Sequence, residues 1–174
     1  MQLRRRLSNA WQAGMGSLAG SCICGGAMIA CSLIAGCASP PQSSGPVHPP
    51  LSADMSSDMA IHAVGLVGTP YRWGGNTPDS GFDCSGLIGY VYKGRTGSAP
   101  PRTVAQLAGW GQPVQAQDLR SGDLVIFGAN PPNHAGIYVG AGRFVHAPSR
   151  GGTVRMDRLD NRHWSSQPTR FRRP

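Results

Sequence analysis

After Cys37 the chain has a single cysteine, Cys84, and this limits the disulfides and metal sites that the region can form. Residues 1–36 are predicted to be a secretory signal peptide, because they combine a basic start, a short apolar stretch and small residues before the expected cut. The region after Cys37 therefore has no disulfide of its own, although it would enter an oxidising compartment. Two roles are open for Cys84: a small buried hydrophobe or a catalytic nucleophile.

Two other classes of site lack the residues they need. A zinc centre built on Cys84 and two downstream histidines would require a fourth ligand, and no nearby motif supplies one. No metal ion or cofactor is therefore expected. No nucleic-acid-binding motif is present, although the chain is basic, with 16 Lys and Arg residues against 8 acidic ones. Without the signal peptide a net charge of about +5 remains, which suits a polyanionic partner other than nucleic acid.

The apolar stretch within residues 18–36 lacks the features of a retained membrane anchor. It is close to the lower limit of about 20 residues for a spanning helix, is rich in Gly, Ser and Cys, and has no basic segment after it. Cleavage is therefore favoured. The sequence IAGC at 34–37 resembles the bacterial lipobox. The resemblance implies that Cys37 becomes an acylated N-terminus, and Ala38 in place of Asp implies an outer-membrane lipoprotein on the periplasmic side.

The rest of the chain divides into a tether and one domain. Residues 37–55 are rich in Pro and Ser and are predicted to be a tether, since such a segment cannot bury a core. Within residues 56–174, apolar spacing predicts one helix that ends before Gly68 and another from Cys84 to about residue 92. After a short helix through Leu107, alternation predicts strands at 123–127, 134–139, 143–147, 153–156 and 169–172. Helices followed by an antiparallel sheet indicate an α+β domain.

Two histidines are expected to meet on one face of this sheet. If residues 140–142 form a three-residue hairpin loop, Val139 lies opposite Arg143. His134 and His146 then point the same way as diagonal neighbours on adjacent strands. A two-residue loop would shift the register by one residue and send His146 to the opposite face.

These positions suggest nucleophilic chemistry. The N-terminus of a helix favours the thiolate form of Cys84, and its free backbone N–H can stabilise an oxyanion. A neighbouring imidazole can take the thiol proton and return it to a leaving amine, and His146 can orient His134 by accepting its N–H. Tyr71 is a candidate second oxyanion donor. Asp83 is expected to cap the helix instead of acting as an acid or base.

Several motifs in order carry a family resemblance over residues 57–172. They read YRWGG (71–75), DCSG (83–86), PRT (101–103), SGDLVIF (121–127), HAGIY (134–138) and FVHA (144–147). This set resembles the NlpC-type cell-wall peptidases. The resemblance implies a papain-like α+β fold, with N-terminal helices packed on the sheet, and a triad of Cys84, His134 and His146. It matches Tyr71 to a tyrosine beside the oxyanion site.

The same resemblance suggests a substrate-binding role for the two residues that flank the nucleophile. In some members these positions hold the free amine of a peptidoglycan stem peptide. They correspond to Asp83 and Ser85, although Ser85 could simply cap the helix.

The implied function is that of a lipid-anchored cysteine endopeptidase acting on peptidoglycan stem or cross-link peptides. The expected bond is the D-glutamyl–diaminopimelate bond or a diaminopimelate cross-link. One alternative is a non-catalytic wall-binding lipoprotein, against which the intact set of Cys84, His134 and His146 argues. The other is amidase or acyltransferase chemistry, because the triad fixes the covalent mechanism and not the acceptor. Peptidoglycan and the membrane are the expected partners, and the sequence identifies no protein activator.

Overall fold

The computed structural model describes residues 51–149 and 152–174. The expected signal peptide, the acylation site at Cys37 and most of the expected tether lie outside the described residues. Within the two described ranges, no helix is long and apolar enough to cross a membrane.

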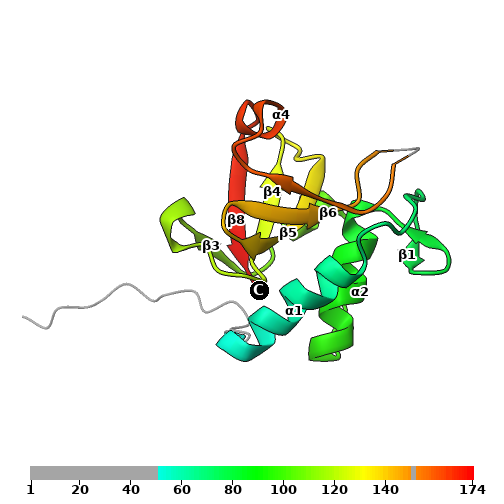
Figure 1. Cartoon of the computed structure of the whole chain (residues 1–174). Coiled ribbons are helices and arrows are strands. Elements are labelled where there is room, and N and C mark those ends of the chain that lie inside the picture. Colours follow the sequence, from blue (N-terminus) through cyan, green and yellow to red (C-terminus); the bar gives the residue numbers. More distant parts are fainter. Residues whose placement is uncertain (1–50, 150–151) are drawn as a thin grey trace, which may run out of the picture. The chain divides into compact units, whose positions relative to one another are not determined.

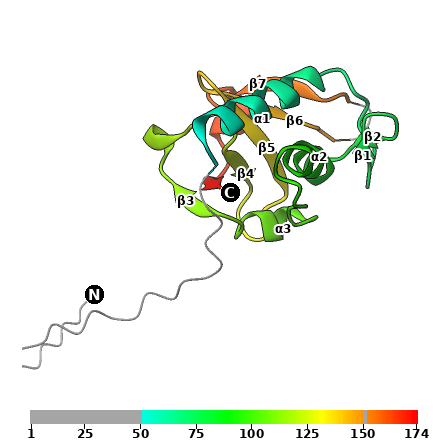
Figure 2. The same ribbon diagram turned by 90° about the horizontal axis from the view of Figure 1, so that it is seen from below.

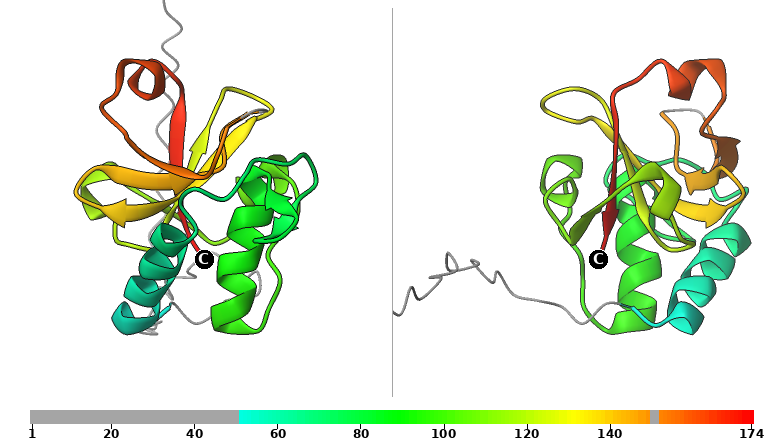
Figure 3. Two further views of the ribbon diagram at one scale, coloured as in Figure 1. Left: turned by 45° about the vertical axis from the view of Figure 1, so that its right-hand side comes forward. Right: turned by 90° about the vertical axis from the view of Figure 1, so that its left-hand side faces the viewer.

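Two long helices and a six-stranded antiparallel sheet make up the described part of the chain, which confirms the α+β class (Figure 1). Helix α1 (Ala53–Gly65) and helix α2 (Cys84–Thr96) pack side by side and both contact β5 (Figures 1 and 3). The sheet order is β3-β8-β4-β5-β6-β7. Its strands are β3 (Gln112–Val114), β4 (Leu124–Phe127), β5 (His134–Gly140), β6 (Arg143–His146), β7 (Arg155–Arg158) and β8 (Thr169–Arg173).

The remaining elements are short. Strands β1 (Asn76–Thr77) and β2 (Gly81–Phe82) form a separate small hairpin before α2. Helix α3 (Val104–Leu107) and the 3-10 turn η1 (Ala116–Asp118) lie between α2 and β4, and helix α4 (Arg162–Ser165) precedes β8. Figure 2 shows α1, α2 and α3 from below, with the strands behind them.

Some boundaries differ from those expected. Helix α1 begins at Ala53, capped by Ser52, whose hydroxyl accepts from the Met55 N–H at 3.2 Å, so the helix reaches into the segment expected to be tether. Helix α2 runs past residue 92 to Thr96 because Gly97 ends it in the left-handed conformation, at φ 73°. Strand β7 covers 155–158 instead of 153–156, because it follows the pairing with β6.

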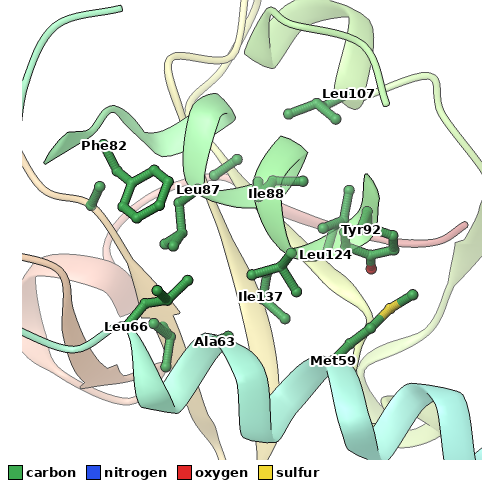
Figure 4. Close-up of a cluster of buried hydrophobic side chains, with 14 of the residues drawn as sticks. Met59, Ala63, Leu66, Phe82, Leu87, Ile88, Tyr92, Leu107, Leu124 and Ile137 are labelled. Carbon is green, nitrogen blue, oxygen red and sulfur yellow. The ribbon is translucent and has the colours of Figure 1, made fainter. Parts of the chain in front are cut away.

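The main core lies between the two long helices and the sheet (Figure 4). Helix α2 buries Leu87, Ile88 and Val91 there, as the apolar spacing predicted. Strand β4 is buried on both faces: Leu124 and Ile126 face the main core, while Val125 and Phe127 join a second cluster with Phe144 and Trp164. A strand covered on both sides reads as a continuous apolar run, which explains the sequence LVIF.

The β5–β6 hairpin has a different turn from the expected three-residue loop. Strand β5 continues to Gly140, and this residue pairs with Arg143 where Val139 was expected, so residues 141–142 alone form the turn. A two-residue turn would by itself have sent His146 to the wrong face. A β-bulge at Val139 adds one unpaired residue and restores the expected register farther along the strands.

Candidate active site

Cys84 is the first residue of α2 and lies where that helix meets the sheet. Asp83 caps the helix, as expected, by accepting from the Gly86 N–H at 2.7 Å. The half-buried sulfur faces the backbone N–H groups of Ser85 and of Ala135, the residue after His134. The start of β5 therefore lies against the N-terminus of α2, and the two elements bring Cys84 and His134 into one site.

The electrostatics of Cys84 differ from the expectation that the helix N-terminus favours the thiolate. Burial raises the pKa of the Cys84 thiol, and the negative charge of Asp83 raises it further. The backbone N–H groups that face the sulfur lower the pKa, but they do not outweigh these two effects. In the free protein the thiol form is therefore favoured.

The two histidines meet as expected. His134 Nε2 and His146 Nδ1 lie 2.8 Å apart, with ring planes at 88°. The close approach depends on Gly136 between them, because a Cβ there would lie 2.9 Å from the Val145 carbonyl oxygen and 3.1 Å from the His146 Cβ. A larger residue at this position would push β6 away from β5.

Both imidazoles are neutral near pH 7. Burial, followed by the neighbouring His146, which would repel a second positive charge, lowers the pKa of His134 to about 3. Burial lowers the pKa of His146 to about 4, although the nearby Asp157 carboxylate raises it. Neutral imidazole is the form that can accept a proton from a thiol.

Two residues that the sequence reasoning missed complete this cluster. Asp157 Oδ2 lies 3.1 Å from His146 Nε2 and accepts from the Trp164 Nε1–H at 2.9 Å. The Trp164 ring stacks on His134, with centroids 5.2 Å apart, and meets His146 edge-on. No local sequence signal marks either residue, because Asp157 lies just beyond the expected strand 153–156, which in the structure runs to Arg158, and Trp164 is buried through tertiary packing.

Asp83 and Ser85, expected to bind a substrate amine, already have partners within the protein. Both Asp83 carboxylate oxygens contact the Arg102 guanidinium, at 2.6 and 3.1 Å, and one also accepts from the Gly74 N–H at 2.9 Å. The Ser85 hydroxyl donates to Asp83 at 3.1 Å. Burial raises the pKa of Asp83, but the hydrogen bonds from Arg102, the Gly86 N–H and Ser85, together with the charge of Arg102, outweigh it and hold this pKa below its usual value. A substrate ammonium group would have to share the carboxylate with Arg102.

Tyr71 lies beside the segment that leads to the nucleophile. It forms an isolated parallel bridge with Phe82, two residues before Cys84, and its backbone N–H donates to the Gly152 carbonyl at 2.8 Å. These contacts fix its main chain near the start of α2, where the family resemblance places it.

A cavity of about 600 Å³ adjoins the Asp83–Arg102 pair along α2. Its lining includes Gly86, Tyr90, Lys93 and Arg102 and contains no carboxylate. The space is therefore suited to a polar ligand with negative charge. Within residues 51–149 and 152–174, no three His, Cys, Asp or Glu side chains are grouped so that they could hold a metal ion.

Comparison with curated proteins finds a glutamyl hydrolase and a murein endopeptidase. The chain is 40% identical over 127 residues to the gamma-DL-glutamyl hydrolase of Bacillus subtilis, covering 71% of this chain and 30% of the relative. It is 39% identical over 103 residues to the murein DD-endopeptidase MepH of Escherichia coli, covering 56% of this chain and 38% of the relative. The chain thus spans less than half the length of these relatives.

Solved structures share the fold. An NlpC/P60 family protein from Bacillus cereus has a TM-score of 0.63 at 29% identity, covering 72% of this chain and 41% of that chain. RipD from Mycobacterium tuberculosis, described as a non-catalytic NlpC/p60 domain protein adapted to peptidoglycan binding, has a TM-score of 0.58 at 25% identity, covering 68% and 96%. Residues 68–173 match the NlpC/P60 family itself. With its motifs, its fold and this match in agreement, the chain belongs to the NlpC/P60 family.

Proposed function

We propose that this protein is a cysteine peptidase that hydrolyses peptidoglycan stem or cross-link peptides through an acyl-enzyme. The observation that carries the proposal is the hydrogen-bonded pair of His134 and His146 at the end of the sheet that meets Cys84. The names of the relatives support the substrate class, since one is a gamma-DL-glutamyl hydrolase and the other a murein DD-endopeptidase.

In the proposed reaction, the Cys84 thiol proton passes to His134 as the sulfur attacks the carbonyl carbon of the scissile bond. The backbone N–H of Cys84, with Tyr71 as second donor, stabilises the oxyanion. The C–N bond breaks as His134 returns the proton to the leaving amine. Water attacks the resulting thioester with His134 as base, which releases the new carboxyl group and restores the thiol.

The pKa directions favour general-base activation over a stored ion pair. With the Cys84 pKa raised and that of His134 lowered to about 3, the resting protein holds a thiol beside a neutral imidazole. Proton transfer then accompanies attack on the bound substrate, instead of preceding substrate binding.

The proposed bond is the D-glutamyl–diaminopimelate bond of the stem peptide or a diaminopimelate cross-link. The names of the two relatives point to one bond each, a glutamyl bond and a DD bond. The cavity beside α2 has Lys93 and Arg102 in its lining; Arg102 is paired with Asp83, and Lys93 offers positive charge to the free carboxylates that such peptides carry.

The proposal includes a lipid anchor at Cys37 and an outer-membrane location. The IAGC sequence at 34–37 supports it. Mass spectrometry of the mature N-terminus tests it, because acylation of Cys37 adds the mass of its acyl chains and a Cys37→Ala variant would lack them. A mature protein with an unmodified Cys37 would refute the anchor.

The non-catalytic alternative corresponds to the role described for RipD. A non-catalytic function would require a site that no longer activates a nucleophile. Here the nucleophile, the base and the orienting histidine are all present, and the two histidines are hydrogen-bonded. We therefore favour turnover, with transfer to water over transfer to an amine acceptor.

The deciding experiment incubates the purified protein with wall digests that contain intact stem peptides and cross-links. A Cys84→Ala variant serves as the matched control, and mass spectrometry identifies the products. Fragments that form only with Cys84 present would establish the peptidase, and their masses would name the bond. If the folded protein yields no fragment, but binds the digest, the non-catalytic function replaces this proposal.

A further inference from the structure

We propose that Asp157 is a positioning residue for the reaction, and that it sets which nitrogen of His134 acts as the base by acting through His146. This inference rests on the proposed peptidase function. It extends the triad by a fourth residue, which neither the motifs nor the comparisons identify.

The charge state of Asp157 follows from its surroundings. Its Oδ2 atom lies 3.1 Å from His146 Nε2, 2.9 Å from Trp164 Nε1 and 3.0 Å from an Arg155 guanidinium nitrogen. Burial raises the pKa of Asp157, but the hydrogen bonds from Trp164, His146 and Arg155 help to lower it below the usual value. The side chain is therefore an ionised carboxylate near pH 7, and it can only accept hydrogen bonds.

A neutral imidazole carries a single N–H, and this determines the tautomers of His146 and His134. Because Asp157 only accepts, the single N–H of neutral His146 lies on Nε2. His146 Nδ1 then carries a lone pair and accepts from His134 Nε2, at 2.8 Å. The single N–H of His134 is thereby used, and its Nδ1 is left with the lone pair that can take the proton of Cys84.

Loss of Asp157 would allow the tautomers of both histidines to change. Without an acceptor at Nε2, His146 can carry its proton on Nδ1 instead. His134 Nε2 must then accept, so that the His134 proton moves to Nδ1. That tautomer has no lone pair for the thiol proton, and general-base activation is lost.

The fold holds Asp157 firmly in this place. Strand β7 pairs with β6 so that Arg155 lies opposite His146 and Asp157 lies opposite Phe144, which makes Asp157 the diagonal neighbour of His146. Trp164, which is only 7% exposed, binds the carboxylate with its N–H while its ring packs on His134. One indole thus contacts both the Asp157 carboxylate and the His134 imidazole.

The charge of Asp157 has a second effect. His134 becomes a cation during the reaction, in a site where burial, followed by the neighbouring His146, His163 and Arg155, lowers its pKa. Asp157 supplies the opposing charge and raises the pKa of both histidines. Asp83, which precedes Cys84 in the chain and is paired with Arg102, acts on the thiol.

Two variants separate these effects. Asp157→Asn keeps an oxygen that can accept from His146 but removes the charge, and Asp157→Leu removes both. The matched control is Asp160→Asn, because Asp160 is also paired with an arginine, Arg158, but is 66% exposed. We expect kcat/KM to fall by roughly 100-fold in Asp157→Leu, the lower end of what general acid–base catalysis contributes. The fall should be smaller in Asp157→Asn and absent in Asp160→Asn.

Nitrogen-15 NMR of the imidazoles gives a readout that does not depend on turnover. We expect His134 and His146 to be Nε2–H tautomers in the unmodified protein, and His146 to become a mixture or Nδ1–H in Asp157→Leu. In Asp157→Asn the pKa of His146 should decrease, because the charge that raises it is gone.

Unchanged tautomers in Asp157→Leu would overturn the inference, as would equal activity of all three variants. Circular dichroism shows whether each variant folds. If Asp157→Leu does not fold, the kcat/KM of Asp157→Asn and the pKa of His146 in that variant decide the question. If the unmodified protein cleaves no wall peptide, the proposed function fails. The tautomers then still decide the role of Asp157.

Discussion

The indole ring of Trp164 lies nearly parallel to the imidazole ring of His134, at an interplanar angle of 23°. The same indole donates its N–H to Asp157. One buried aromatic residue therefore contacts both His134 and Asp157, and we expect changes at this position to affect both folding and catalysis.

Replacement of Trp164 by Phe keeps a ring against His134 but removes the donor to Asp157. We expect stability to fall by about 1–3 kcal/mol, since a hydrogen bond to a charged group is lost. We expect kcat/KM to fall several-fold, because the carboxylate is less well held. Chemical denaturation and steady-state kinetics measure the two effects. Trp73→Phe is the control, because Trp73 is 77% exposed; equal effects at both positions would contradict a specific role for Trp164.

The raised pKa of the Cys84 thiol predicts the pH dependence of its alkylation. Only the thiolate reacts, and its fraction rises about tenfold per pH unit below the pKa. We therefore expect the rate of reaction with iodoacetamide to keep rising from pH 6 to pH 9 without a plateau. A plateau at or below pH 7 would instead reveal a thiolate–imidazolium pair, and would contradict the general-base route.

Two glycines of α2 provide a matched test of how the nucleophile is positioned. A Cβ on Gly86 would lie 2.0 Å from the Gly75 carbonyl oxygen, whereas a Cβ on Gly89 would meet nothing within 4 Å. Gly86→Ala should displace the loop that precedes the nucleophile and lower both stability and activity. Gly89→Ala should stabilise the helix by up to about 1 kcal/mol without displacing the nucleophile, because alanine favours helix. Similar losses in both variants would indicate that helix propensity, and not this contact, matters.

A buried ion pair anchors the last strand to the sheet. The Asp123 side chain is only 3% exposed and receives two hydrogen bonds from Arg173, at 2.7 and 2.8 Å. Arg173→Ala would leave this carboxylate unpaired, and we expect a loss of about 3 kcal/mol in the free energy of unfolding. Urea denaturation measures it. Arg158→Ala removes an exposed pair and should change little; an equally small effect of Arg173→Ala would show that water replaces the arginine.

Much of the fold could be read from local sequence patterns. The apolar spacing after Cys84 predicted α2, and the alternation in HAGIYVG and FVH predicted β5 and β6, because each pattern reflects burial of one face of one element. Placement of the two histidines on one face was correct, although the assumed loop was wrong.

The rest of the site depends on contacts between distant segments. Arg102 reaches Asp83 from 19 residues away, and Asp157 meets His146 through the pairing of β6 with β7. Neither contact follows from periodicity, because an exposed charge and a paired charge look alike in a sequence. The pKa of Cys84 was likewise misjudged, since the helix terminus is visible in the sequence and the burial that opposes it is not.

The bulge at Val139 bears on how this hairpin can change in length during evolution. Twelve positions separate His134 from His146 along the chain. With this spacing, the bulge and the two-residue turn together place both rings on one face of the sheet. A single insertion in the turn would reverse the second ring unless the bulge were lost at the same time. Gaps in alignments of homologous chains should therefore come in compensating pairs here, one at the tip and one at the unpaired residue.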